Sequence, residues 1–162
     1  MPTYVVTVPQ GRLSSKQKMQ LGEEITQVHC DITGAPSYFA QVIINEVLDR
    51  NYFVGGKPLQ GTDHIWLHGI IRAGREAAVK DRMLVELMKV VSKIAEVDEH
   101  NVQVYISEIL ARQVLEFGKI LPNPGEEQQW FESIPVNLRT RILADQFGYN
   151  ESTLEELSLI HI

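Results

Sequence analysis

Two arginines, Arg72 and Arg75, stand in the segment RAGRE, where an apolar strand pattern gives way to a helix pattern. The amino end of a helix carries a partial positive charge, so it favours anions and disfavours cations. Two guanidinium groups are therefore unfavourable there unless an anion joins them. Together with the backbone N–H groups of the helix end, Arg72 and Arg75 would hold a carboxylate well. The alternative is a pair of solvated arginines, one of them paired with Glu76.

Proline at position 2 directly precedes the strand pattern TYVVTV. If Met1 is removed, the nitrogen of Pro2 becomes a free secondary amine, which can carry a proton in a reaction. If Met1 is retained, that nitrogen is an amide without basicity. A catalytic proline is therefore a hypothesis that depends on the processing of Met1.

Three more side chains could do chemistry, and each also has an ordinary structural explanation. His29 lies at the edge of an apolar helix stripe near the carboxyl end of the helix, where the helix dipole favours a surface histidine. Tyr105 stands among apolar strand residues, as a core tyrosine does when its hydroxyl reaches the edge of the core. Glu116 lies between Leu115 and Phe117 and is otherwise typical of a solvated acid. Taken singly, His29 and Tyr105 favour the structural explanation.

The elements that must position these residues form a repeated β-α-β pattern. Apolar residues with helical spacing recur over 16–33 and 79–94, and strands are predicted at 2–8, 38–47, 64–71 and 101–109. QVIINE at 41–46 aligns with QVYISE at 103–108, and we call the offset in residue number between these two segments the repeat shift. The same offset also aligns the two predicted helices. We therefore predict an α/β (α+β) fold, in which a tandem β-α-β repeat forms a four-stranded sheet with two helices on one face.

The domain organisation follows from this repeat. The 162 residues suit a single domain, 1–162, with a first β-α-β unit at 2–47, a second at 64–109 and a C-terminal extension at 110–162 that reads as a turn and short helices. The strand at 38–47 has an apolar central run, which predicts burial of both its faces. Because the helices cover one face of the sheet, other subunits are the simplest cover for the opposite face.

Composition excludes several classes of protein. The net charge of −6 argues against a nucleic-acid surface. No run of about 18 apolar residues is present to span a membrane, and the start of the chain has no secretory pattern, so the cytoplasm is the expected location. Cys30 is the only cysteine, which rules out a disulfide within the chain. The histidine spacing suits no metal and no nucleotide-binding loop is found, so we expect no metal and no cofactor.

Taken together, these residues resemble the tautomerase superfamily, and in particular cis-3-chloroacrylic acid dehalogenase and its homologues. The resemblance runs from Pro2 to about Ile142. Its motifs are Pro2, ITQVHCDITG around His29, AQV at 40–42, NYFVGG at 51–56, HGIIRAGR at 68–75, VYISEI at 104–109, EFG at 116–118, PNPGEE at 122–127 and WF at 130–131. It implies the tautomerase fold, an N-terminal catalytic proline, assembly into a homotrimer and a small carboxylate substrate.

The resemblance also assigns roles to residues. Pro2 matches the catalytic proline. His29, Arg72 and Arg75 match the groups that bind the substrate carboxylate. Tyr105 and Glu116 match the pair that positions and activates water. These six residues are our candidate site.

Three functions remain open at this point. The first is hydrolytic dehalogenation or hydration of a small unsaturated carboxylate of the 3-haloacrylate type. The second is keto-enol tautomerisation of a 2-oxo acid such as phenylpyruvate. The third is a non-catalytic binding protein, which a retained Met1 would favour. Ala35, Phe39 and the loop around 57–63 depart from the dehalogenase pattern, and these positions would shape the pocket.

Overall fold

The computed structural model describes residues 2–48 and 50–147, and it divides into two compact units, Met1–Leu110 and Ala111–Ile162. The elements of the first unit are β1 (Thr3–Pro9), α1 (Ser15–Thr33), β2 (Gln41–Val47), the short hairpin β3 (Phe53–Val54) and β4 (Lys57–Pro58), β5 (Ile65–Arg72), α2 (Ala77–Ala95) and β6 (Val102–Ile109). Single 3₁₀ turns lie at Ser37–Phe39 and Glu99–Asn101.

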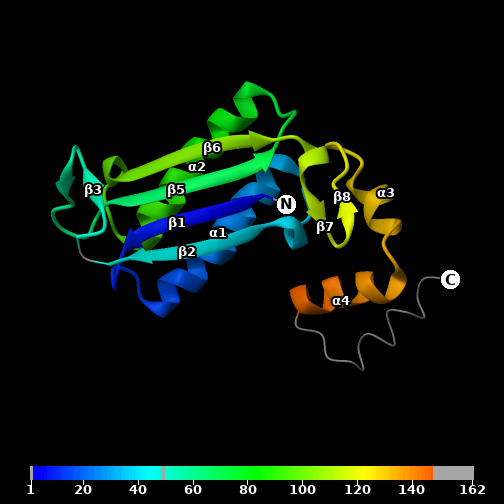
Figure 1. The fold of residues 1–162 in the computed structure, drawn as a ribbon, viewed down its shortest axis with the longest axis horizontal. Helices are drawn as coiled ribbons and strands as arrows, with labels where there is room; N and C mark the ends of the chain where they lie inside the picture. Colours follow the sequence, from blue (N-terminus) through cyan, green and yellow to red (C-terminus); the bar gives the residue numbers. More distant parts are fainter. Residues whose placement is uncertain (1, 49, 148–162) are drawn as a thin grey trace. The chain divides into compact units, whose positions relative to one another are not determined.

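The main sheet has four strands in the order β2-β1-β5-β6. Strands β1 and β2 are parallel, β5 and β6 are parallel, and β1 and β5 are antiparallel at the centre. Both long helices lie behind the same face of this sheet (Figure 1). The predicted tandem β-α-β architecture is confirmed, and the repeat shift carries both ends of α1 onto the two ends of α2.

The core lies between this sheet face and the two helices. Every second residue of β1 and β5 is buried, as expected when one sheet face packs on helices. The helices contribute apolar residues at intervals of four. The fully buried members of this cluster include Tyr4, Val6, Val8, Leu21, Ile25, Ile65, Leu67, Ile71, Met83, Leu87 and Val91.

Capping and ion pairs secure the ends of the repeats. Ser14 caps α1 in a capping box with Gln17, and Gly34 ends the helix at φ 68°. In the first repeat, Lys18 Nζ lies 2.9 Å from Glu46 Oε2, and in the second, Lys80 Nζ lies 2.7 Å from Glu108 Oε2. The repeat shift carries the first pair onto the second, so the repeat extends to its side-chain contacts.

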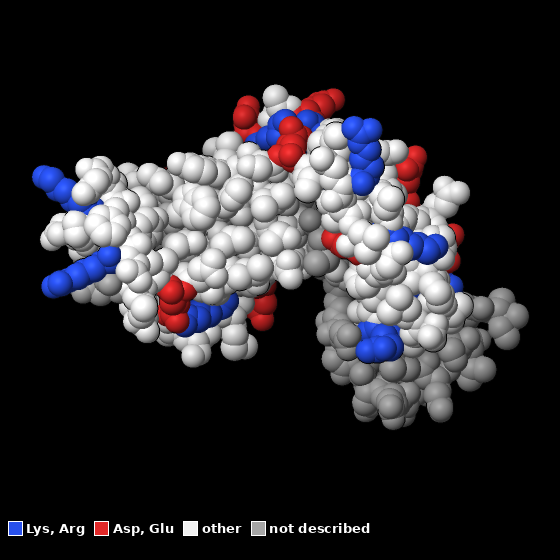
Figure 2. All heavy atoms as spheres, in the orientation of Figure 1, with Lys and Arg blue, Asp and Glu red and all other residues white. Residues whose placement is uncertain are grey.

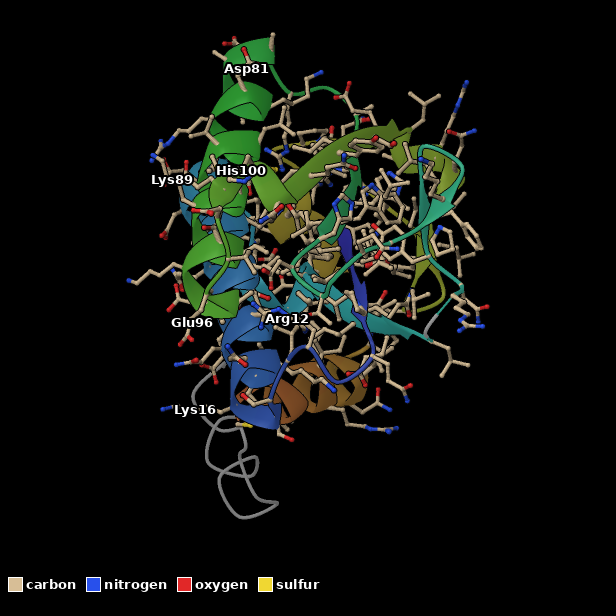
Figure 3. The ribbon with its side chains drawn as sticks, turned by 90° about the vertical axis from the view of Figure 1, so that its left-hand side faces the viewer. Arg12, Lys16, Asp81, Lys89, Glu96 and His100 are labelled. Carbon is tan, nitrogen blue, oxygen red and sulfur yellow. The ribbon has the colours of Figure 1, made fainter. Side chains whose placement is uncertain are left out.

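The end of α2 is tied to the loop after β1 (Figure 3). Arg12 Nη2 donates a hydrogen bond to the carbonyl of Ala95 at 2.7 Å, next to Glu96, which ends the helix in a left-handed conformation. Arg12 Nε lies 3.2 Å from Asp63 Oδ1. These contacts hold the loop before α1 against the end of α2 and the loop before β5.

One strand differs from its prediction. Residues 38–40 are outside β2, because a 3₁₀ turn occupies Ser37–Phe39. Within the chain, β2 alternates exposed and half-buried residues, and Ile43 is 39% exposed, so the prediction that both faces are buried is wrong for the single chain. The reason is position: β2 is an edge strand, and α1 covers only one of its faces.

The second unit contains the hairpin β7 (Leu115–Glu116) and β8 (Lys119–Ile120), then α3 (Glu127–Glu132) and α4 (Val136–Phe147). Its short helices were predicted, but its hairpin was not. Trp130 is buried and donates a hydrogen bond from Nε1 to the carbonyl of Ile120 at 2.7 Å. Among the residues that the structure describes, no helix has the length and apolar character needed to cross a bilayer.

Candidate active site

The start of β1 and the end of β5 lie at the same edge of the sheet. The antiparallel pairing places Thr3 opposite Ile70, so Pro2 and Arg72 lie just beyond that pair on neighbouring strands. Pro2 is buried, and its carbonyl accepts a hydrogen bond from the backbone N–H of Gln41 at 2.9 Å. The beginning of the chain is thereby held next to the arginine segment.

His29 approaches the same place from α1. It lies one turn before the end of that helix and is only 2% exposed, so its side chain faces the sheet rather than solvent. Its Nδ1 lies 2.7 Å from Tyr4 Oη, and the two rings meet edge to face at 5.7 Å. Its Nε2 is buried and has no hydrogen-bond partner among the described residues. The alternative explanation for His29, a surface histidine, is therefore wrong, because the apolar stripe of α1 carries this residue into the core.

The arginines lie on the segment between β5 and α2. Arg72 ends β5 and is buried, and Arg75 is half-buried after Gly74, whose φ of 106° an L side chain rarely adopts. Glu108 on β6 accepts hydrogen bonds from Lys80 Nζ and from the backbone N–H groups of Gly74 and Arg75. The lysine contact first, and then the two backbone contacts, lower the pKa of this carboxyl group. The carboxylate of Glu108 therefore fixes the backbone that presents Arg75.

Positive charge gathers around His29. Burial, and then the charges of Arg75, the amino terminus of the chain and Arg72, lower the pKa of His29 from 6.5 to about 4. Burial raises the pKa of Tyr4, while Arg75 opposes that shift. His29 is therefore neutral near pH 7, and the cations around it form a region suited to a small anion.

Tyr105 is not brought together with these residues. It lies on β6 opposite His68 of β5, is 54% exposed, and its ring meets the Trp66 ring edge to face at 5.8 Å. Trp66 and His68 alternate along β5 with buried residues, so they belong to the sheet face opposite the helices. Tyr4 and His29 lie on the helix side. Within one chain, the sheet itself separates Tyr105 from them. The alternative explanation for Tyr105, a core tyrosine, is wrong because its side chain is exposed.

Glu116 belongs to the second unit. It ends β7 and pairs with Lys119 of β8 across a tight turn. Phe117 and Gly118 form that turn with φ values of 49° and 77°, as a two-residue hairpin loop requires. The hairpin thus fixes the strand position of Glu116 within its own unit.

Two residues of the site were missed from the sequence. Tyr4 lies two residues after Pro2, and in a strand this spacing places both on one face. Glu108 is the counterpart of Glu46 under the repeat shift, and both carboxylates hold the turn that follows the first strand of their repeat. The period of two and the repeat are the signals that could have identified them.

Comparison with known proteins shows the family to which this chain belongs. A family model described as putative oxalocrotonate tautomerase enzyme matches residues 1–133. A solved structure of a member of the cis-3-chloroacrylic acid dehalogenase (cis-CaaD) family is 32% identical, covers 86% of this chain and 97% of its own, and superimposes with a TM-score of 0.82. The chain belongs to the tautomerase superfamily, in its cis-CaaD-like family.

Two further relatives of this tautomerase-superfamily chain cover less of it. A probable tautomerase of Bacillus cereus is 39% identical over 59 residues, which make up 36% of this chain and 95% of that protein. A wild-type fused 4-OT, solved as an asymmetric trimer, is 27% identical with a TM-score of 0.66, and the match covers 73% of this chain and 94% of that one. Among the described residues, no three His, Cys, Asp or Glu side chains are placed to hold a metal ion.

Proposed function

We propose that this protein, once Met1 is removed, uses the amine of Pro2 to protonate a carbon atom of a small unsaturated carboxylate, and so catalyses hydration or hydrolytic dehalogenation of a 3-haloacrylate-type acid. The supporting observation is that the positive charges of Arg75, the amino terminus and Arg72 lie around a buried, neutral His29. Such a site favours a substrate with a negative charge next to the reacting amine. Membership of the cis-CaaD-like family supports the same reaction class.

In this proposal, His29, Arg72 and Arg75 bind the substrate carboxylate. They also stabilise the negative charge that builds up on it when water adds to C3. Guanidinium groups are suited to this task because they bind carboxylates through paired, charge-assisted hydrogen bonds.

The chemical step uses three more groups. Glu116, assisted by Tyr105, takes a proton from water as its oxygen bonds to C3, and protonated Pro2 delivers a proton to C2. With a halogen on C3, the product is a halohydrin, which loses halide and the hydroxyl proton to give an aldehyde acid. With an acetylenic acid such as propiolate, the same addition of water gives an enol that becomes the corresponding 3-oxo acid, which for propiolate is the same aldehyde acid.

We further propose that the active form is a homotrimer. The open face of the main sheet presents a broad surface without Lys, Arg, Asp or Glu in Figure 2, and Ile43 and Tyr105 are exposed there. A related fused 4-OT is described as a trimer. Because Tyr105 faces away from His29, it would act at the site of a neighbouring copy. Light scattering that finds a monomer at micromolar concentration would refute this assembly.

Keto-enol tautomerisation of a 2-oxo acid is the second candidate. It needs a neutral Pro2 that acts as a base, and the cations that lower the pKa of His29 would also lower the pKa of an amine beside it. A relative described as a probable tautomerase supports this reaction. The third candidate, a binding protein, applies if Met1 is retained.

The deciding experiment begins with a mass measurement that establishes whether Met1 is absent. The processed protein is then assayed with cis- and trans-3-haloacrylates, a propiolate and phenylpyruvate. Glu116→Gln should lower hydration or dehalogenation by orders of magnitude and spare tautomerisation, because only the addition of water needs a base for water. Pro2→Ala should abolish every activity, and unchanged activity in that variant would refute the catalytic proline.

The setting of this reaction is also a proposal. We expect it to run in the cytoplasm without metal or cofactor. The net charge of −6 gives no reason to expect a nucleic-acid partner, and we expect no membrane partner either.

A further inference from the structure

Tyr4 occupies a buried position between the sheet and both helices. Its side chain is 0% exposed, and its hydroxyl lies 2.7 Å from His29 Nδ1 on α1 and 3.3 Å from Met83 Sδ on α2. Tyr4 is not one of the six residues of the candidate site. Its hydroxyl is nevertheless the one described hydrogen-bond partner of a His29 ring nitrogen.

The ring of Tyr4 is held by its neighbours. Gly69 lies opposite Tyr4 on β5, and a Cβ atom built at Gly69 would lie 2.7 Å from Cε1 of the tyrosine ring. The Tyr4 ring therefore fills the space that a side chain at position 69 would need. A ring held on that side and bonded at its hydroxyl has a fixed direction for its hydrogen bond.

The hydroxyl of Tyr4 carries one hydrogen, which can go to only one of its two neighbours. If it goes to Met83 Sδ, His29 must donate from Nδ1 to Tyr4, and Nε2 is then a bare lone pair. If it goes to His29 Nδ1, Nε2 carries the other hydrogen of the neutral ring. A thioether sulfur is a weak acceptor and an imidazole nitrogen a strong one, so the second arrangement is favoured.

We infer that Tyr4 is a positioning residue that donates to His29 Nδ1, fixes the Nε2–H tautomer and so makes neutral His29 a hydrogen-bond donor to the substrate carboxylate. This inference rests on the proposed function in one respect, namely that the ligand is a carboxylate. A carboxylate has only acceptors, so a bare Nε2 would repel it, whereas Nε2–H binds it. An uncharged imidazole with a lowered pKa is a known way to supply such a donor.

The tautomer is measured directly by ¹⁵N NMR of the histidine rings in the full-length protein, at pH 7 and without any substrate. For His29 we expect a protonated Nε2 and an unprotonated Nδ1. Propionate, an unreactive carboxylate, is then titrated and should shift the Nε2 resonance. In Tyr4→Phe, we expect a mixture of tautomers and propionate binding about fivefold weaker, the scale of one lost hydrogen bond.

Met83→Leu is the matched variant, because it removes the sulfur acceptor and keeps the volume. It should retain the wild-type tautomer and propionate affinity. A wild-type His29 protonated on Nδ1 would overturn the inference even if Tyr4→Phe fails to fold. So would a folded Tyr4→Phe with unchanged tautomer and affinity, or a loss in Met83→Leu equal to that in Tyr4→Phe.

These measurements are separate from the test of the proposed function. A protein that lacks activity on all the acids tested but shows the expected tautomer and propionate binding would refute the proposed reaction and keep the role of Tyr4. An active enzyme whose His29 is protonated on Nδ1 would support the proposed reaction and refute the role of Tyr4.

Discussion

Acidification below neutrality should destabilise the fold through His29. Its side chain is buried and neutral, with a pKa of about 4 in the folded protein against 6.5 in an exposed histidine. A base with a lowered pKa in the folded state binds protons mainly after unfolding. Its contribution to stability is therefore complete above pH 6.5 and is lost as the pH falls from 6.5 towards 4.

The magnitude follows from these two pKa values. At pH 5, an exposed histidine is almost fully protonated and His29 in the folded protein is not, which amounts to about 2 kcal/mol of lost stability relative to pH 7.5. Urea unfolding of the wild type and of His29→Gln at both pH values would measure it. Glutamine does not titrate, so the wild type should lose about 2 kcal/mol more than the variant over this interval.

The comparison cancels the contribution of every other ionisable group, because the two proteins differ only at position 29. The protomer concentration is kept fixed because self-association would also shift the unfolding midpoint. Equal losses in the two proteins would refute the reasoning. An NMR titration that places the pKa of His29 near 6.5 would refute it as well.

Three more predictions concern the residues around the site. Gly69→Ala should destabilise the protein by about 1–3 kcal/mol in urea unfolding, because the new Cβ would meet the Tyr4 ring at 2.7 Å. Glu108→Gln should raise KM about threefold to tenfold by releasing the backbone of the arginine segment, whereas Glu46→Gln, its counterpart in the first repeat, should leave KM unchanged. Arg75→Ala should lower kcat/KM by about tenfold to a hundredfold in steady-state assays with a carboxylate substrate, and full activity would exclude the anion site.

Local patterns predicted the fold well and the site only in part. Helical spacing and the repeat shift were enough for the strands, helices and their order, because both reflect backbone periodicity that each segment carries by itself. The two-residue strands of the hairpins were missed, since a period of two needs more residues to be visible. A surface position was an alternative for His29, because the sequence places it at the edge of an apolar helix stripe but does not show how deeply the sheet covers that edge.

The exposure of Tyr105 could not be predicted from the sequence either. An apolar neighbourhood along a strand does not reveal which sheet face is covered, and here the face of Tyr105 is open within the chain. Which sheet face each strand residue joins depends on register and on the helices, and both are properties of the assembled unit.

The repeat also explains why one chain should carry one such site although it carries the scaffold twice. Under the repeat shift, Pro2, His29, Arg72 and Arg75 correspond to His64, Val91, Gln10 and Leu13. The backbone nitrogen of His64 is an amide because Asp63 precedes it, so it cannot act as an amine. The side chain of Val91 has no hydrogen-bond donor to replace that of His29, and Gln10 and Leu13 stand where the second repeat has its two arginines. Nearby, Arg12 contacts Asp63 and the carbonyl of Ala95, so its charge serves the packing of the loops. A free backbone amine exists only at the start of a chain, and the cations that would serve it lie at and just after the end of β5, the strand paired with that start.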